Sequence, residues 1–542
     1  MDVIAPDGMP ANEPVLAHGP GSIERRTLLE TLRELGGTVT EAPCVIDGKD
    51  VHTGRQFEVR PPHRREDVVA TVHGAEHDTV DAAISAAMDA RHDWQAMPLA
   101  DRMAIFDRAA DLLSGPWRAR LNASTMLGQS KTIQQAEIDS ACELIDFWRI
   151  NNHFLATIAA RQPRSTESAQ NELEARPLDG FVLAICPFNF TSIAANLPSA
   201  PAVCGNTIVW KPSEKQALSA HFTMRLLHQA GLPDGVINLV HGDGGLVAER
   251  CLADPAFAGL HFTGSATVFR SLWQRIGSGI TTYRQFPRIV GETGGKDFIL
   301  AHPSADEDAL VTAMIRGAFE YQGQKCSAAS RAYLPRTLWA RLRDRLIDET
   351  RGLAIGDVAD PTTFLGAVID ERALRRHQDL FDRVAADADV TVMAGGTTDE
   401  SDGWFVEPTI LASDDPRHET MTTEWFGPIL TCFVYEDSAW EEVLELVDTT
   451  SPYALTGAVF AEDEEAIGRA RARLRFSAGN FYINDKPTGA VVGQQPFGGS
   501  RASGTNDKAG WENNIQRWIS PRTVKRNLAP PTHHGYPSTE PD

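Results

Sequence analysis

The chain has 542 residues, a formal net charge of -22 and an ordinary globular composition, with 42% hydrophobic and 23% charged residues. Its length predicts two to four domains, and its acidic balance argues against nucleic acid or an anionic membrane as a partner. No run of about 18 apolar residues predicts a transmembrane span. The first 30 residues show neither a signal peptide nor an Arg-rich transit peptide. The cytoplasm is therefore the expected location, although a matured protein of the mitochondrial matrix would look the same.

The first predicted elements are helices. Apolar residues recur at helical spacing over 78–113, and Pro98 divides this stretch into two amphipathic helices. A further helix is expected over 137–154. The polar segment 161–176 is either a linker or a strand pair that projects from the body. Both chain ends, at 1–22 and 528–542, are rich in Pro, Gly and polar residues, so we expect them to be flexible.

Short apolar runs alternate with helical stretches from Phe181 onward. The runs cover 181–185, 207–210, 236–240 and 260–262. This βαβ alternation predicts a mostly parallel, doubly wound sheet. A second α/β block begins after Leu310 and extends to about Trp518.

Three stretches imitate well-known motifs. Residues 242–245 begin like a dinucleotide fingerprint but have Val247 where the third glycine belongs, and 291–296 is one residue short of a phosphate loop. His73-Gly-Ala-Glu-His77 fits the inverted zinc motif H-x-x-E-H, which works only on a helix. Gly74 lies inside it and a helix cap follows it. We interpret this match as chance and expect no metal site.

A thiol and a carboxylate, each among small residues, carry the strongest chemical signal. Cys326 lies in Gln-Gly-Gln-Lys-Cys-Ser-Ala, and Glu292 lies upstream in Gly-Glu-Thr-Gly-Gly-Lys. Small neighbours allow close approach to the thiol, and a carboxylate can activate the water that frees a product. Taken alone, Cys326 would be a buried core cysteine. The seven cysteines include no C-x-x-C pair, which indicates reduced thiols.

With further motifs in order, the chain resembles the aldehyde dehydrogenase superfamily from about residue 20 to about residue 530. The motifs are Pro187-Phe-Asn189-Phe190, Trp210-Lys211-Pro-Ser-Glu214, Phe262-Thr-Gly264-Ser265 and Glu424-Trp-Phe426-Gly-Pro.

The resemblance implies an α/β fold with a Rossmann-type NAD-binding domain, an α/β catalytic domain and a small β oligomerisation flap. The implied division has an N-terminal arm over 1–40, the NAD-binding domain over 41–155 and 177–302, and the catalytic domain over 303–515. Segments 156–176 and 516–542 form the flap and the tail. The flap implies a homodimer or a dimer-based oligomer.

The resemblance also implies NAD as cofactor. Gly264 and Ser265 open a helix after a strand, so N–H groups and the helix dipole face the pyrophosphate. Lys211 and Glu214 would hold the adenosine ribose, where a carboxylate favours NAD over NADP. The alternative is that Lys211 and Glu214 form an ordinary ion pair on the surface. The implied cofactor-binding residues are Cys186, Pro187, Phe188, Lys211, Ser213, Glu214, Thr263, Gly264, Ser265, Glu424 and Phe426.

In the implied chemistry Cys326 attacks an aldehyde as thiolate. The Asn189 amide and the Cys326 N–H stabilise the oxyanion. Hydride then leaves to the nicotinamide, and Glu292 activates the water that hydrolyses the thioester.

Within the family, the string from Phe481 to Lys508 resembles the branch that oxidises glutamate γ-semialdehyde to glutamate, the second step of proline catabolism. Ala490 stands where some relatives have Ser. The implied substrate-binding residues are Glu143 for the amino group, Phe190 and Phe497 for the aliphatic chain, and Lys325, Ser327, Gly489 and Ala490 for the α-carboxylate.

Two alternatives stay open: another short aldehyde such as succinic semialdehyde, or a non-catalytic binding or structural protein that keeps the fold. The presence of Cys326, Glu292 and Asn189 argues against the second. The chain lacks another large domain, so a proline dehydrogenase partner would be a separate protein.

Overall fold

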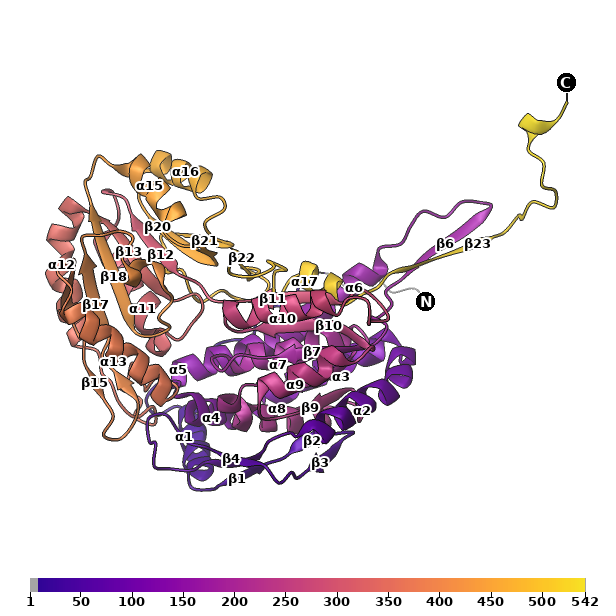
Figure 1. Ribbon diagram of the computed structural model, residues 1–542, viewed down its shortest axis with the longest axis horizontal. Helices are drawn as coiled ribbons and strands as arrows, with labels where there is room; N and C mark the ends of the chain where they lie inside the picture. The colour runs from indigo at the N-terminus through magenta and orange to yellow at the C-terminus, as the bar shows by residue number, and fades with distance from the viewer. Residues whose placement is uncertain (1–7, 542) are drawn as a thin grey trace.

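The computed structural model describes residues 8–541. Figure 1 shows two lobes, each built around a sheet, and a thin two-stranded ribbon that projects away from them. None of the helices in the described residues is both long and apolar enough to cross a membrane.

The first sheet has seven strands in the order β11-β10-β7-β8-β9-β2-β3. Its five strands from β11 to β9 are parallel, and β2 and β3 add an antiparallel edge. Strands β8 and β10 are buried along their whole length, because a parallel sheet is covered by helices on both faces. The strands are β2 Cys44–Ile46, β3 Lys49–Val51, β7 Phe181–Ile185, β8 Thr207–Lys211, β9 Ile237–Leu239, β10 Phe257–Thr263 and β11 Arg288–Glu292. The βαβ alternation predicted this arrangement correctly.

The two helices predicted over 78–113 are α2 His77–Ala96 and α3 Leu99–Ser114, with Pro98 between them. The helix predicted over 137–154 begins as a π-helix, Glu137–Cys142, and continues as α6 to Ala160. The other helices of this lobe are α1 Ile23–Gly36, α4 Arg118–Gln129, α5 Ile133–Ala136, α7 Thr191–Val203, α8 Ala217–Gln229, α9 Gly244–Ala253, α10 Ala266–Ser278 and α17 Glu512–Arg517.

The second sheet also has seven strands, in the order β14-β17-β18-β13-β12-β20-β21. Its strands are β12 Asp297–Ala301, β13 Ala329–Pro335, β14 Val390–Ala394, β17 Thr409–Ser413, β18 Ile429–Tyr435, β20 Thr456–Phe460 and β21 Asn480–Ile483. The helices of this lobe are α11 Glu307–Phe319, α12 Arg336–Arg351, α13 Glu371–Ala385, α14 Glu419–Thr422, α15 Trp440–Thr449 and α16 Glu464–Arg473.

The predicted division into domains stays a prediction. One detail differs: that division placed β12 with the NAD-binding part, whereas β12 pairs with β13 and β20 in the second sheet. The chain therefore passes from the first sheet to the second between Glu292 and Asp297, in the glycine-rich turn.

Smaller pairings complete the fold. A three-stranded sheet, β1-β5-β4, lies beside the first lobe; its strands are β1 Thr40–Ala42, β4 Gln56–Val59 and β5 Ala70–His73. Two short pairs are β15 Thr398–Asp399 with β16 Phe405–Val406, and β19 Tyr453–Ala454 with β22 Ser500–Arg501.

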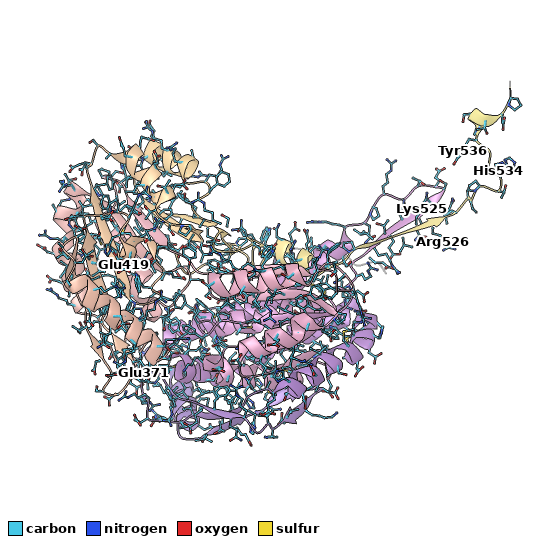
Figure 2. The ribbon with its side chains drawn as sticks, viewed as in Figure 1. Glu371, Glu419, Lys525, Arg526, His534 and Tyr536 are labelled. Atoms are coloured by element: carbon cyan, nitrogen blue, oxygen red, sulfur yellow. The ribbon has the colours of Figure 1, made fainter. Side chains whose placement is uncertain are left out.

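The projecting ribbon pairs β6, Ala169–Glu174, with β23, Arg522–Asn527, in antiparallel register. Of the two readings of 161–176, the strand reading is therefore correct, and the partner strand comes from the C-terminal segment. Figure 2 shows Lys525 and Arg526 on this ribbon, and His534 and Tyr536 on the tail beyond it.

The N-terminal segment differs from the expectation. Residues 1–7 lie outside the described part, but residues 12–18 are tied to the first lobe. Glu13 N–H donates to Asp146 over 2.7 Å, and Leu16 N–H donates to Glu137 over 2.9 Å. The prediction of a flexible end is wrong for this stretch, because its backbone satisfies two buried carboxylates.

Candidate active site

The carboxyl ends of four parallel strands gather predicted residues at one edge of the first sheet. Lys211 ends β8, Thr263 ends β10 and Glu292 ends β11, while Cys186 directly follows β7. The register pairs Thr263 with Glu292 and Ile185 with Lys211, so these ends are level. Ligands of open α/β sheets bind outside this edge.

Cys326 reaches the same place from the second lobe. It lies between the short turn Glu320–Gly323 and β13, and it is only 9% exposed. The turn is tight: Gly323 has φ +64°, and a Cβ there would lie 2.1 Å from Gly427 O. A Cβ on Gly295 would lie 2.4 Å from Cys326 O. The glycine-rich stretch after Glu292 therefore packs directly against the cysteine backbone.

Burial raises the pKa of the Cys326 thiol well above its usual range, and the Glu292 carboxylate adds to the shift. The thiol is therefore neutral until a base accepts its proton. Thiolate is the nucleophilic form, so this site needs a proton acceptor close by.

Glu292 is such an acceptor. Burial raises its pKa to about 8, against an opposing effect of Lys508. Its Oε1 atom is buried and has no hydrogen-bond partner among the described residues. The carboxyl lines a cavity of about 40 Å³ together with Glu143 and Phe497, which has room for a water molecule. A base with a pKa close to the working pH is suited to proton transfer.

Asn189 lies beside the cysteine segment. Its Nδ2 donates to Gln324 O over 3.0 Å, two residues before Cys326, and the side chain is buried. The amide has a second N–H that this bond does not use. It is thus available as one donor of an oxyanion hole, with the Cys326 N–H as the other.

The part of the site predicted to bind the adenosine of NAD contains Lys211. Burial lowers the pKa of Lys211, and the nearby Glu214 and Asp243 carboxylates oppose this shift. Glu214 is exposed and begins the short helix that follows Ser213. Ser265 caps α10, with its Oγ accepting from Val268 N over 3.3 Å.

The structure adds packing details for two predicted cofactor-binding residues, Gly264 and Cys186. A Cβ on Gly264 would lie 2.7 Å from the Phe262 ring, so no larger residue fits there. The Cys186 thiol donates inward to Ala194 O over 3.3 Å, so the backbone of Cys186 and not its thiol is left for a cofactor.

The predicted nicotinamide end is formed by Glu424 and Phe426. The Glu424 Oε1 atom accepts from Gly295 N over 2.9 Å, and burial raises the carboxyl pKa to about 7. Phe426 has φ +55° and its ring stands 5.7 Å from the Phe188 ring, edge to face. The carboxylate therefore reaches into the same glycine-rich turn that touches Cys326.

The predicted carboxylate-binding residues lie together. Ser327 Oγ is 2.8 Å from Thr488 Oγ1, directly before Gly489 and Ala490. Lys486 Nζ donates to Thr488 O over 3.0 Å. Lys325 and Lys486 both approach Glu320, at 3.4 and 3.9 Å.

Two other predicted substrate residues, Glu143 and Phe190, each lie beside a buried polar side chain. Glu143 Oε2 accepts from Ser192 Oγ over 2.5 Å, and burial raises the pKa of Glu143 to about 8. Lys131 lies 4.2 Å from the centroid of the Phe190 ring and is paired with Asp139.

Sequence reasoning missed Lys131, Asp139, Lys486, Thr488 and Lys508. Thr488 and Lys486 precede Gly489 in the string that carried the resemblance, so that string held a signal for them. Lys131 has no motif around it; only the folded chain brings it to Phe190.

The His73–His77 motif does not form a helical zinc site. His73 ends β5 and His77 begins α2, so the two residues are on different elements. Among the other glycine-rich stretches, 242–245 opens α9, which Asp243 caps through Leu246 N.

Comparisons with known proteins agree on one family. The family model "Aldehyde dehydrogenase family" matches residues 50–524. The chain is 46% identical over 531 residues to "Delta-1-pyrroline-5-carboxylate dehydrogenase, mitochondrial" of Dictyostelium discoideum, covering 97% of this chain and 95% of that one.

Solved structures give the same result. The delta-pyrroline-5-carboxylate dehydrogenase of Mycobacterium tuberculosis, solved with bound NAD, is 52% identical with a TM-score of 0.96, and the match covers 100% of both chains. Proline utilization A of Bdellovibrio bacteriovorus is 28% identical with a TM-score of 0.90, over 95% of this chain and 53% of that one.

Proposed function

Because the chain belongs to the aldehyde dehydrogenase family, we propose that it oxidises L-glutamate γ-semialdehyde, the open form of 1-pyrroline-5-carboxylate, to L-glutamate with NAD. The predicted family and fold class are confirmed. The names of the relatives support the substrate, and the NAD-bound relative supports the cofactor.

Two observations carry the proposal: Asn189 Nδ2 donates to Gln324 O, two residues before Cys326, and the Glu292 carboxylate lies close enough to Cys326 to raise the pKa of its thiol. The sheet edge and the α10 N-terminus suit a dinucleotide, since the start of a helix that follows a strand favours an anion such as the pyrophosphate. NAD supplies the hydride acceptor when bound.

The chain's own residues perform the remaining steps. Glu292, or a water beside it, accepts the thiol proton, and the Cys326 sulfur attacks the aldehyde carbon to give a thiohemiacetal. The Asn189 N–H and the Cys326 N–H stabilise the oxyanion, each by roughly 3 kcal/mol. Once Glu292 has passed the thiol proton to solvent and hydride has been lost, it deprotonates the water that attacks the thioester, which releases the acid and the Cys326 thiolate.

Charge supports an acidic substrate. Ser327, Gly489 and Ala490 offer a hydroxyl and backbone N–H groups next to Lys325 and Lys486, and cations with N–H donors favour a carboxylate. Glu143 would receive the amino group, and Phe190 and Phe497 would cover the aliphatic chain. Succinic semialdehyde, which has a carboxylate but no amino group, is the second candidate.

We also propose a homodimer formed through the β6–β23 ribbon, with any proline dehydrogenase as a separate protein. The name of the Dictyostelium relative places that protein in mitochondria. For this chain the cytoplasm remains our proposal, with the mitochondrial matrix as the alternative for a matured eukaryotic protein.

A substrate panel with NAD tests the proposal, run on the wild type and on Cys326→Ser. We expect the highest kcat/KM for glutamate semialdehyde, a lower value for succinic semialdehyde and the lowest for butanal. The Cys326→Ser variant should lose activity on the order of a thousandfold or more. Equal kcat/KM for all three aldehydes would reject the substrate, and an active Cys326→Ser variant would reject the mechanism.

A further inference from the structure

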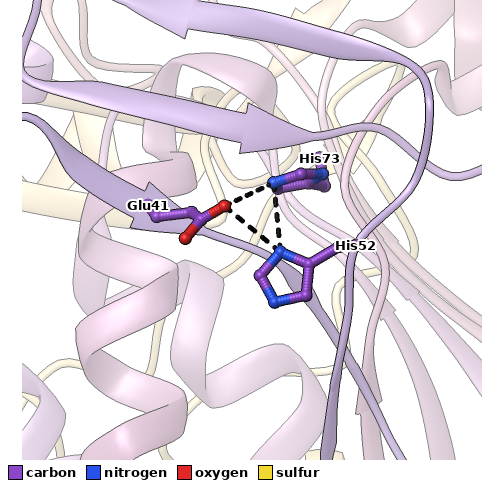
Figure 3. A group of neighbouring side chains, drawn as sticks. All are labelled: Glu41, His52 and His73. Carbon is purple, nitrogen blue, oxygen red and sulfur yellow. Dashed lines mark hydrogen bonds and ion pairs between the residues drawn. The ribbon is translucent and has the colours of Figure 1, made fainter.

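The three-stranded sheet β1-β5-β4 carries a side-chain cluster that has no part in the chemistry above. Glu41 comes from β1 and His73 from the end of β5, while His52 follows β3. Strand β1 pairs with β5 so that Glu41 is level with Thr71, two residues before His73 and therefore on the same face. Figure 3 shows the three side chains converging.

The donor atoms of this cluster form a nearly equilateral triangle. Glu41 Oε1 is 3.1 Å from His73 Nε2 and 3.2 Å from His52 Nδ1, and the two nitrogens are 3.3 Å apart. In a tetrahedral zinc site with bonds of about 2.0–2.1 Å, neighbouring ligand atoms are separated by about 3.3 Å. The triangle thus matches one face of such a site. No other group of this kind occurs within residues 8–541.

His73 is held in place for this role. The residue is 3% exposed, and its second nitrogen, Nδ1, lies 3.1 Å from Thr53 N and 3.0 Å from Thr53 O. The backbone beyond it is also fixed, since Gly74 N donates to Arg55 O over 2.7 Å. When Nε2 faces a cation, Nδ1 carries the ring proton and donates it to Thr53 O, and such a donation to a backbone carbonyl commonly orients metal-binding histidines.

We propose that Glu41, His52 and His73 bind one zinc-class divalent cation, with a fourth position left for water. Two imidazoles favour Zn²⁺ and its neighbours over Mg²⁺ or Ca²⁺. This ligand set takes only His73 from the H-x-x-E-H motif; His77 is not part of it. The expectation of no metal site was drawn from that motif alone, and it did not consider Glu41 or His52.

Bound there, the cation ties β1 and β5 to the loop after β3. The neighbouring residue Ala75 donates to His241 O over 2.8 Å, and Asp243 two residues later caps α9. The site thus stabilises the side of the first lobe that also holds the predicted adenosine end. Because the cation binds the folded chain, it should raise Tm.

The alternative is a proton-only cluster, that is, a hydrogen-bonded cluster without a metal ion, in which both imidazoles donate to the Glu41 carboxylate. With both rings donating, it explains two of the three contacts but brings two N–H donors within 3.3 Å of each other; with one ring nitrogen accepting, that ring no longer donates to the carboxylate. Gln56, level with His73 on β4, has Nε2 3.5 Å from His73 Nε2 and adds another donor. A cation would satisfy both imidazole lone pairs and the carboxylate together.

The test uses chelator-treated full-length protein. His533 and His534 lie next to each other on the tail, with ring centroids 4.5 Å apart, and are a second pair of imidazoles. Both are therefore changed to Ala in the background chain. Co²⁺ is titrated and followed by its visible absorption, and Zn²⁺ is then used to displace it. We expect one ion per chain, and a rise in Tm on adding Zn²⁺.

The Glu41 and His52 side chains are 62% and 50% exposed, so Glu41→Ala and His52→Ala should fold. Each should weaken Co²⁺ binding at least tenfold and abolish the rise in Tm. His92→Ala, an exposed histidine of α2, is the matched control and should change neither. If the background chain binds no ion, or if His52→Ala binds as tightly as the background chain, the metal site is refuted and the proton-only cluster is correct.

Discussion

Glu292 combines a buried, unpartnered carboxylate oxygen with a pKa raised by burial to about 8. As a general base it works only when ionised. Below pH 8 the ionised fraction decreases about tenfold for each pH unit, so acid release should slow accordingly. We predict that kcat rises from pH 6 to pH 9 with an apparent pKa of about 8, measured by steady-state NADH formation.

Glu292→Gln separates the two chemical steps. The variant should form one equivalent of NADH per site in a stopped-flow burst and then stop, because the thioester lacks its base. This assumes that water can assist proton loss from Cys326 in the first step. A steady rate close to the wild-type rate would exclude Glu292 as the base.

The proposed role of Asn189 is to donate one hydrogen bond to the oxyanion. Asn189→Ala should lower kcat by about a hundredfold or more while leaving the Kd for NAD unchanged. The change also removes the bond to Gln324 O, so the NAD measurement is the control for an intact site. A loss below threefold would contradict this role.

Sequence reasoning reached Cys326, Glu292 and Asn189 because small neighbours and local strings mark them. It did not reach Lys131, which has no motif around it, and it gave no role to Lys508, although that residue ends the string that carried the resemblance, because each acts on a residue far away in the chain. Lys131 contacts the Phe190 ring and Lys508 lowers the pKa of Glu292. Contacts across such separations depend on the folded topology, which local spacing does not encode.

At the scale of the element, we expect the loop before β22 to determine the affinity for the substrate. Gly489 has φ +90°, and a Cβ there would lie 2.7 Å from Lys486 Nζ. Gly489→Ala should therefore strain the loop and shift Lys486, raising KM for glutamate semialdehyde at least tenfold. The kcat/KM for butanal, which has no carboxylate, should change little.

Val491→Ala is the matched control for that loop, since Val491 is 37% exposed and one residue beyond Ala490. It should leave both KM values as in the wild type. If Gly489→Ala reduced activity on both aldehydes equally, the loop would have a general structural role and not a carboxylate-binding one.

The π-helix Glu137–Cys142 anchors the N-terminal segment. Burial alone would raise the pKa of Glu137, but His18 and Arg118 lower it to about 2. Its folded pKa is thus below the ordinary value of about 4.5, so its contribution to stability is complete above pH 4.5 and is lost as the pH decreases toward 2.

Glu137→Ala removes this anchor and leaves Arg118 buried without that partner. We predict a loss of roughly 3–5 kcal/mol in the free energy of unfolding at pH 7, measured by urea denaturation. The difference from wild type should shrink as the pH is lowered from 5 to 3. Glu34→Ala, at an exposed ion pair with Arg120, is the control and should cost less than about 1 kcal/mol.

The helices and parallel strands were predictable because each has its own period or apolar run, and Pro98 marks a boundary directly. The anchored segment 12–18 was not. Its Pro and polar composition resembles that of a mobile end, and only the distant carboxylates of Glu137 and Asp146 give its backbone partners.

At the scale of the whole molecule, the β6–β23 ribbon is not expected to be stable without further contacts. Every residue of β23 is exposed, and an isolated two-stranded ribbon is marginally stable in water. The outer edge of β6 is covered, because the Gln162 and Ser165 side chains bond the backbone of Leu173 and Asn171. The outer edge of β23 has no such cover among the described residues, and a second chain can complete it. A ribbon that projects from the body, as Figure 1 shows, is in the right place to reach a neighbouring copy.

If the proposed dimer forms through the ribbon, deleting 521–542, which removes β23, should leave a monomer, measured by sedimentation velocity or light scattering. Deleting only 529–542 keeps β23, which ends at Asn527, and should preserve the dimer. Because the catalytic residues come from the two lobes and none from the ribbon, the monomer should still give an NADH burst. If both deletions remained dimeric, the ribbon could not be the contact that holds the two copies together.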